Sequence, residues 1–211
     1  MPAIPDMGNL KSMNASDNLI IDPDGLRISK AIASIVVPGS SILDIGCGNR
    51  MLYDAVCGKA NNCYYMGLDI DRSTIRKLHQ SIEEQPGSCR CDFSNMNVSN
   101  VPPLSFDYCI CSRLFHHFDE TTALYYLTQM VQITKNGVFL IIVDYVRDYS
   151  CRKDHFLYLP DFFITALQCG KKEIEKVSGG TSKPLSLEKG CIWMLAARKN
   201  RTSWQFSLTS V

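Results

Sequence analysis

The hydrophobic pattern divides the chain into short apolar runs and longer stretches of helical period. Apolar runs of strand length occur at residues 41–45, 63–69, 106–112 and 138–144, and residues 89–92 form a weaker candidate strand. Apolar residues at helical spacing lie at residues 23–37, 50–57, 73–82 and 119–134. Asp22 and Asp119 each stand where a helical stretch begins, so we expect them to be N-caps.

Strands that alternate with helices in this way predict an α/β fold, in which helices cover both faces of a mostly parallel, doubly wound sheet. Toward the end of the chain the pattern predicts a helix at residues 160–168 and strands at residues 173–177 and 191–197. No helical stretch separates these two strands, so we expect a hairpin and one antiparallel strand near the C-terminus. Asn136 and Gly137 are expected to form the turn before strand 138–144.

The chain is long enough to bury one core of ordinary size. It has 211 residues, of which 45% are hydrophobic and 20% are charged. Residues 23–199 are expected to form a single domain. Residues 1–22 are expected to be a flexible N-terminal arm or partial lid, and residues 200–211 a tail.

Charge and hydropathy limit the classes of partner. With 22 basic and 21 acidic residues the formal net charge is +1, so no large basic field favours nucleic acid. The longest apolar run, Gly137–Val143, is far shorter than the roughly 20 residues needed to span a bilayer. The N-terminal residues also lack the pattern of a secretory signal. We therefore expect a cytoplasmic protein without a membrane span.

The ten cysteines are scattered through the sequence. The close pairs, Cys89 with Cys91 and Cys109 with Cys111, have C-x-C spacing, which lacks the C-x-x-C pattern typical of zinc ligands. Without a secretory signal we expect reduced thiols and no metal site.

Residues suited to ligand binding follow the first three strands. Gly46 and Gly48 let the backbone turn tightly and approach a ligand after strand 41–45. Asp69 follows the next strand, about 20 residues beyond Gly48, the spacing of a carboxylate that binds ribose hydroxyls. Asp92 closes the third strand and is a candidate acceptor for an adenine amino group. The carboxyl ends of parallel strands are where doubly wound sheets bind ligands, so we expect one nucleoside site.

Two cofactors fit such a site, and Asp44 discriminates between them. A dinucleotide requires G-x-G-x-x-G, but Met51 stands where the third glycine belongs. Asp44 would also place a carboxylate near the phosphates of a dinucleotide. S-adenosylmethionine (SAM) has no phosphate, and its methionine end carries an ammonium and a sulfonium that attract an acid. The sequence therefore favours SAM.

Three segments carry a family resemblance. The segment Asp44–Asn49 (DIGCGN) resembles the glycine-rich SAM-binding motif of class I SAM-dependent methyltransferases, and Gly67–Ile70 (GLDI) resembles their ribose-binding motif. The segment Phe106–His117 (FDYCICSRLFHH) resembles the region after the fourth strand in the small-molecule branch, including the ubiquinone- and menaquinone-biosynthesis type. The resemblance implies a Rossmann-like sheet of seven strands, mostly parallel, with one antiparallel strand.

The resemblance also implies roles for single residues. Asp44, Gly46 and Gly48 would surround the methionine moiety, and Ser112 would offer backbone groups there. Asp69 would bind the ribose. The adenine would lie between Ile70 and Phe93, with Asp92 at its amino group.

Three residues are candidates for catalysis or acceptor contact. His116 or His117 would be a general base for an acceptor hydroxyl or amine, because a neutral imidazole suits that task near pH 7. The alternative is that the two histidines only shape the loop before Asp119, since methyl transfer depends strongly on positioning. Asp144 follows the fifth strand on the expected acceptor side.

The function predicted is in-line methyl transfer from SAM to a small-molecule acceptor. Ser112-Arg113-Leu114-Phe115 stands where methyltransferases of nucleobases or glutamine carry an Asn- or Asp-Pro-Pro-Tyr sequence. The alternatives are an RNA or protein methyltransferase, or a SAM-binding partner subunit that has lost catalysis. The sequence leaves open whether the protein forms a homodimer or binds a partner protein.

Overall fold

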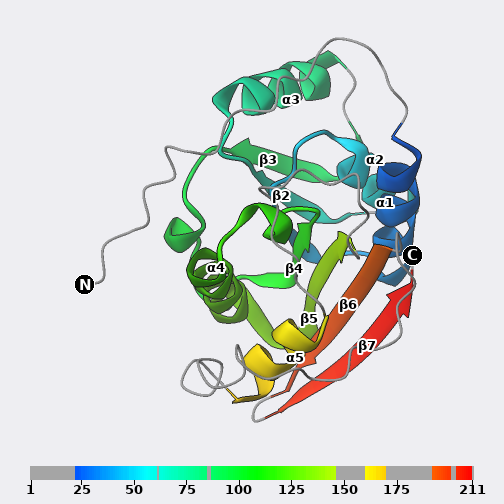
Figure 1. Ribbon diagram of the computed structural model, residues 1–211. Helices are drawn as coiled ribbons and strands as arrows, with labels where there is room; N and C mark the ends of the chain where they lie inside the picture. Colours follow the sequence, from blue (N-terminus) through cyan, green and yellow to red (C-terminus); the bar gives the residue numbers. More distant parts are fainter. Residues whose placement is uncertain are drawn as a thin grey trace.

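The computed structural model describes residues 22–60, 62–84, 87–145, 160–169, 192–200 and 203–210. Within these residues seven strands form one sheet in the order β3-β2-β1-β4-β5-β6-β7 (Figure 1). The strands are β1 (Ser41–Ile45), β2 (Tyr64–Leu68), β3 (Arg90–Ser94), β4 (Phe106–Ser112), β5 (Thr134–Tyr145), β6 (Ile192–Lys199) and β7 (Trp204–Ser210). The helices are α1 (Pro23–Ile35), α2 (Met51–Lys59), α3 (Arg72–Glu84), α4 (Glu120–Ile133) and α5 (Pro160–Cys169), with short 3-10 turns η2 (Val98–Asn100) and η3 (Phe115–His117).

The sheet topology is that of a doubly wound α/β fold. Strand β1 pairs in parallel with β2 on one side and with β4 on the other. Strands β3 and β5 extend the two halves, also in parallel. The prediction of a mostly parallel, Rossmann-like sheet is therefore confirmed. The chain order reverses between β1 and β4, which is where folds of this type bind ligands.

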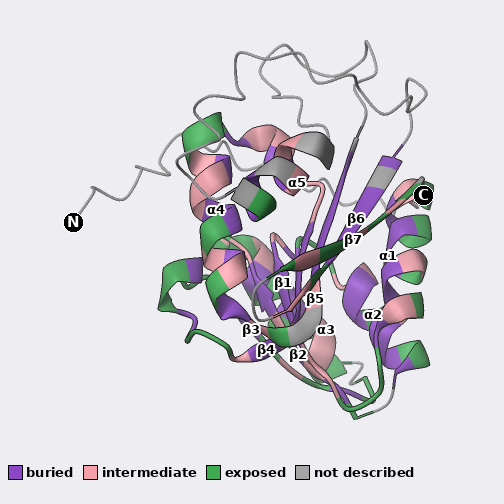
Figure 2. Ribbon diagram, turned by 90° about the horizontal axis from the view of Figure 1, so that it is seen from below, coloured by how far each residue is buried: buried purple, intermediate pink, exposed green. Residues whose placement is uncertain are grey.

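Helices cover the sheet on both faces, so alternate residues of the central strands enter different cores. On one face, Ile42, Ile110 and Ile141 pack with residues of α1, α2 and α3. On the other, Leu43, Cys109 and Leu140 pack with residues of α4 and α5. Figure 2 shows the buried strands between these two helical layers. Within the residues described, no helix combines the length and hydropathy needed to cross a membrane.

The predicted caps have a direct geometric basis. Asp22 accepts a hydrogen bond from the backbone N–H of Gly25, and Pro23 opens α1. Asp119 accepts one from the backbone N–H of Thr122 at the start of α4. Both predictions are confirmed, because a side-chain oxygen at these positions satisfies an amide that the helix leaves without a partner.

The C-terminal part of the sheet differs from the prediction. Strand β6 runs antiparallel to β5, as expected of one strand near the C-terminus. Residues 200–211 were expected to be a tail, yet β7 pairs antiparallel with β6 and forms an edge of the sheet. The predicted boundary at residue 199 was wrong, because Trp204, Phe206 and Leu208 are half-buried against the core. The predicted strand 173–177 and the N-terminal arm up to residue 21 lie outside the described residues.

A second difference concerns the start of β5. Asn136 and Gly137 were expected to form a turn, but β5 already begins at Thr134, directly after α4. Thr134 pairs with Phe106, and the register then shifts before Tyr108 pairs with Phe139. The strand thus absorbs the turn-like residues as an irregularity in its pairing with β4.

Candidate active site

A small cavity lies at the carboxyl ends of β1 and β4, beside α1. Its volume is about 40 Å³, and its lining includes Asp44, Gly46, Ser112 and Arg113. The first two turns of α1 close it, with Gly25, Ile28 and Ser29. Such a volume holds roughly three water molecules, so it suits a small polar group.

The two glycines after β1 have the backbone conformation that the sequence predicted. Gly46 has a φ of +75° and Gly48 a φ of +52°, both in the left-handed region. The backbone N–H groups of Gly46 and Cys47 both donate to the carbonyl of Leu68. A Cβ on Gly46 would lie 2.8 Å from a methyl group of Leu114, so only glycine lets this loop pass beneath that side chain.

Asp44 is a buried acid that faces the cavity. Its exposed fraction is 3%, and its Oδ2 accepts a hydrogen bond of 2.5 Å from the Tyr65 hydroxyl. Among the described residues, its Oδ1 has no hydrogen-bond partner. Burial raises the pKa of Asp44 to about 7, with a smaller contribution from the negative charge of Asp69, while the Tyr65 hydrogen bond opposes the rise. This carboxylate would be stabilised by a cation in the cavity.

Asp69 joins the end of β2 to the glycine loop. Its Oδ2 accepts the backbone N–H of Gly48 at 2.9 Å, and its Oδ1 accepts that of Asp71 at 2.9 Å. Each carboxylate oxygen has two lone pairs, so these bonds leave capacity for ligand hydroxyls. Ile70 follows with an exposed fraction of 52%, which is an apolar surface beside the same loop. The role of both residues in nucleoside binding stays a prediction.

Asp92 and Phe93 do not lie where the sequence interpretation expected them. Strand β3 continues to Ser94, so Asp92 lies within the strand and opposite Met66 of β2. Its Oδ2 accepts a hydrogen bond from the Tyr64 hydroxyl on the exposed part of the sheet. Nothing in this placement directs Asp92 toward an adenine beside Ile70.

The ring of Phe93 belongs to the core. Its exposed fraction is 5%, and it contacts the rings of Tyr53 and Tyr65 edge-on or tilted. A Cβ on Gly67 would lie 2.6 Å from this ring, so Gly67 lets Phe93 lie flat against β2. The predicted sandwich of adenine between Ile70 and Phe93 is therefore wrong for Phe93. Ser94 and the partly exposed Met96 stand at the end of β3 instead.

A feature that the sequence interpretation did not assign follows β4. Arg113 has a φ of +55°, a conformation rare outside glycine, and its N–H donates to the carbonyl of Val143. Its guanidinium Nη1 forms an ion pair with Asp22 Oδ2 at the edge of the cavity. Burial would raise the pKa of Asp22, but the backbone hydrogen bond from Gly25 and the ion pair with Arg113 outweigh burial, so the pKa is lowered.

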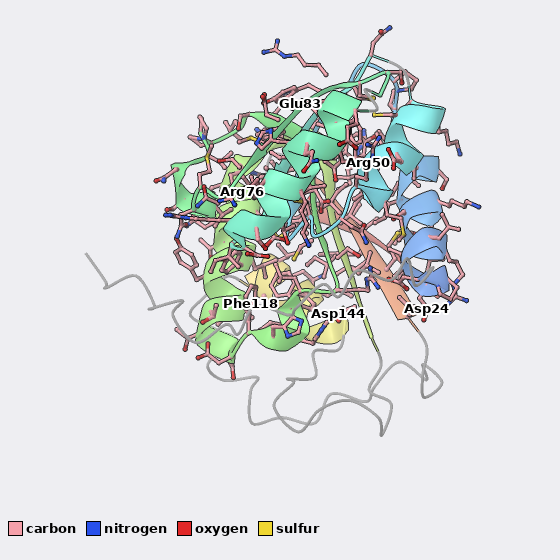
Figure 3. The ribbon with its side chains drawn as sticks, turned by 90° about the horizontal axis from the view of Figure 1, so that it is seen from above. Asp24, Arg50, Arg76, Glu83, Phe118 and Asp144 are labelled. Carbon is pink, nitrogen blue, oxygen red and sulfur yellow. The ribbon has the colours of Figure 1, made fainter. Side chains whose placement is uncertain are left out.

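His116 and Asp144 form a hydrogen-bonded pair on the other side of the sheet edge. The Nδ1 atom of His116 lies 2.7 Å from Oδ1 of Asp144, and the backbone N–H of His116 donates to Oδ2 at 3.1 Å. The Asp144 side chain is 3% exposed and that of His116 is 16% exposed. In Figure 3, Asp144 lies along the same edge of the molecule as Phe118 and Asp24.

His117 and the cysteines have other surroundings. The ring centroid of His117 lies 4.1 Å from that of His116, and its backbone N–H donates to the carbonyl of Leu114. Burial raises the pKa of the Cys47 thiol, between Gly46 and Gly48, well above its usual value, so this thiol stays protonated and is a poor nucleophile. Within the described ranges, no cluster of three or more His, Cys, Asp or Glu side chains is placed to hold a metal ion.

The fold and the cavity together define a class of protein. A doubly wound sheet with left-handed glycines after β1, an acid at the end of β2 and a cavity beside β4 is the arrangement of the class I, SAM-dependent methyltransferases. The donor set fits SAM, because Asp44 presents an unpartnered buried oxygen to the place where a ligand cation would lie. Phosphate sites usually present the backbone N–H groups of a helix N-terminus. A phosphate in this cavity would instead meet the negative charge of Asp44.

Comparison with known proteins agrees with this class. Residues 42–137, just under half of the chain, match the family described as "Methyltransferase domain". A curated relative from Xanthomonas campestris pv. campestris, "Ubiquinone biosynthesis O-methyltransferase", is 26% identical over 102 residues. That match covers 47% of this chain and 41% of the relative, so it spans less than half of the relative's length.

Solved structures show the same fold. The mitomycin 7-O-methyltransferase MmcR has a TM-score of 0.51 at 17% identity, with 62% of this chain and 39% of that chain covered. Coclaurine N-methyltransferase, bound to N-methylheliamine and SAH, has a TM-score of 0.51 at 16% identity, with 61% and 38% covered. The [4+2]-cyclase SpnF has a TM-score of 0.52 at 18% identity, with 60% and 47% covered.

Proposed function

We propose that this protein transfers the methyl group of SAM to a hydroxyl group of a small molecule, with His116 as the general base. The observation that carries the proposal is the contact of 2.7 Å between His116 Nδ1 and the buried carboxylate of Asp144. Asp144 is a positioning residue, because it acts on the acceptor only through His116.

Asp144 fixes both the ring and the tautomer of His116. One carboxylate oxygen accepts the backbone N–H of His116 and the other accepts Nδ1–H of the ring. The neutral imidazole then carries its lone pair on Nε2, where it can accept a proton. The same logic relates the acid, histidine and nucleophile of hydrolytic triads.

Bound SAM supplies an electrophilic methyl group on a positively charged sulfur. Asp44 and the loop from Gly46 to Gly48 would hold its methionine end, and Asp69 its ribose. His116 would take the proton of the acceptor hydroxyl at Nε2 while the oxygen attacks the methyl in line with the departing sulfur.

A base of this kind favours oxygen over nitrogen as the acceptor atom. A hydroxyl must lose its proton during transfer, whereas a neutral amine already has a lone pair for attack. The curated relative is an O-methyltransferase by name, which supports the same choice. The balanced charge of +1 favours a small molecule over RNA.

Kinetics of matched variants test the base. His116→Ala should lower kcat by about 10²–10⁴-fold for a phenol or alcohol acceptor, while SAM affinity stays within about twofold. Asp144→Asn should also lower kcat strongly, because the amide would donate to Nδ1 and leave a proton on Nε2. His117→Ala is the matched control, and it should retain most of the turnover.

The acceptor provides a second readout. An acceptor that is already ionised should lose much less rate in His116→Ala, since no proton transfer remains. Equal losses in His116→Ala and His117→Ala, or equal losses for ionised and neutral acceptors, would contradict the role of His116. A wild-type protein that binds SAM but shows no turnover across a broad panel of hydroxyl acceptors would favour the non-catalytic alternative.

A further inference from the structure

The proposed base stands on a segment that is held at three consecutive residues. Leu114 is the N-cap of the short turn η3, and Phe115 and His116 follow it. Asp144 of β5 holds His116 through two hydrogen bonds. Phe115 is fully buried and contacts the ring of Phe163 in α5, with ring centroids 4.7 Å apart. These contacts fix His116 relative to β5 and to the helical layer of α4 and α5.

Leu114 makes the third contact, and it lies against the glycine loop after β1. A Cβ at Gly46 would lie 2.8 and 3.3 Å from the two methyl carbons of Leu114 and 3.4 Å from its Cγ. The leucine side chain thus covers Gly46 on the side where a Cβ would stand. Leu114 is half-buried and also packs against the core on the α4 side. It therefore touches both the loop proposed to hold SAM and the core that holds Phe115.

The three contacts fix different coordinates of His116. Asp144 fixes the orientation of the imidazole, and Phe115 fixes the turn against the core. Of these three contacts, only that of Leu114 reaches the glycine loop. Methyl transfer requires close alignment of the reacting groups, and a displacement of about 1 Å can lower the rate by about 10²-fold. The distance from His116 to bound SAM therefore depends on how η3 rests on this loop.

We infer that Leu114 positions His116 relative to the glycine loop, so that the base and the SAM methyl group are held at the distance that transfer requires. The inference rests on the proposed function, because Leu114 acts on the acceptor only through His116. Leu114 is thus a positioning residue. Its side chain suits the task, since packing holds a half-buried leucine by shape and it offers no group that competes for the acceptor proton.

Kinetics of Leu114 variants test this role. Leu114→Ala removes the contact with Gly46 and keeps both partners of the His116–Asp144 pair. We expect kcat for a neutral hydroxyl acceptor to fall by about 10- to 100-fold, while S-adenosylhomocysteine (SAH) binds within about twofold of wild type. Leu114→Met keeps an apolar side chain of similar volume, so it should restore most of kcat.

Leu124 provides the matched control for a purely structural effect. It is a half-buried leucine of α4 that packs against the same core, but it does not belong to the segment that carries His116. Leu124→Ala should lower the free energy of unfolding, as Leu114→Ala should, yet keep kcat within about twofold of wild type. All rates are measured at a temperature at which circular dichroism shows each variant folded.

Combination with His116→Ala separates positioning from other roles. Without the imidazole no base remains to be displaced, so Leu114→Ala should add less than about twofold to the loss caused by His116→Ala. An acceptor that is already ionised should likewise lose little rate in Leu114→Ala, because it needs no base. A full additional loss in the double variant, or an equal loss with the ionised acceptor, would show that Leu114 does not act through His116.

The remaining outcomes distinguish the base from its support. If His116→Ala is impaired while Leu114→Ala is as active as wild type, the base stands and Leu114 does not position it. If Leu114→Ala weakens SAH by more than about tenfold, Leu114 supports the glycine loop and not the base. If His116→Ala keeps most of the turnover, the proposed base is wrong and the role of Leu114 is wrong with it.

Discussion

Two buried acids at the edge of the sheet, Asp44 and Asp144, differ in what surrounds them. Their exposed fractions are 3% and 2%. Asp144 accepts two hydrogen bonds from His116, whereas Asp44 accepts one from Tyr65. Since a buried carboxylate with few donors disfavours its charged form, Asp44 is the residue that a bound cation would stabilise.

The pH dependence of stability should report Asp44. Its pKa is raised from 3.8 to about 7, so the folded protein holds this proton more tightly than the unfolded chain. The stabilising contribution is complete below pH 3.8 and is lost as pH rises to about 7. Asp44→Asn has no proton to lose, so it should be more stable than wild type at pH 8 by about 2–4 kcal/mol.

Urea unfolding at pH 5 and pH 8 measures this difference. The extra stability of Asp44→Asn, measured as its free energy of unfolding relative to wild type, should shrink at pH 5, where wild-type Asp44 is protonated. The affinity of this variant for SAH should also fall. Tyr65→Phe, which keeps Asp44 but removes its hydroxyl donor, is a useful comparison. An equal effect of Asp44→Asn on stability at both pH values would show that Asp44 is ionised throughout the range.

Site residues could be predicted from the sequence only where the end of the preceding strand was predicted correctly. Asp44, Gly46 and Ser112 line one cavity as the motif implied. Asp92 and Phe93 do not lie at the predicted adenine site, because β3 runs two residues further than the sequence pattern indicated. Arg113 was missed, since a left-handed backbone conformation in an arginine has no sequence signal.

At the scale of elements, the central strands were the easiest to predict. Strands β1 and β4 are mostly apolar because helices cover both of their faces, and the acids Asp44 and Asp107 are the exceptions. Strand β7 was missed although Trp204, Phe206 and Leu208 alternate with polar residues. Its Ser and Thr content resembled a tail, and only pairing with β6 makes it part of the sheet.

A pair of substitutions tests the place of β7 in the fold. Phe206 is half-buried against the core shared with α4 and α5, whereas Ser207 is exposed. Phe206→Ala should lower the free energy of unfolding by about 1–2 kcal/mol. Ser207→Ala should change it by less than about 0.5 kcal/mol. Equal small effects, measured by urea unfolding, would mean that β7 contributes little to the folded state.

At the scale of the whole molecule, the cavity and the histidine pair lie on opposite faces of the sheet. Asp44 faces α1 and α2, whereas Asp144 faces α4. The short segment from Ser112 to His116 connects the two sides at the end of β4. Ligand and acceptor would therefore meet across this segment, with the cavity on one face of the sheet and the histidine pair on the other.

The central claim is that SAM binds along the carboxyl ends of β1, β2 and β4. Calorimetric titration of wild-type protein with SAH and with NAD tests it most directly, using Asp69→Ala and Asp92→Ala as variants. We predict micromolar SAH affinity, no NAD binding, and a loss of about 2–4 kcal/mol for Asp69→Ala alone. NAD binding without SAH binding, or SAH affinity in Asp69→Ala within about twofold of wild type, would contradict the account.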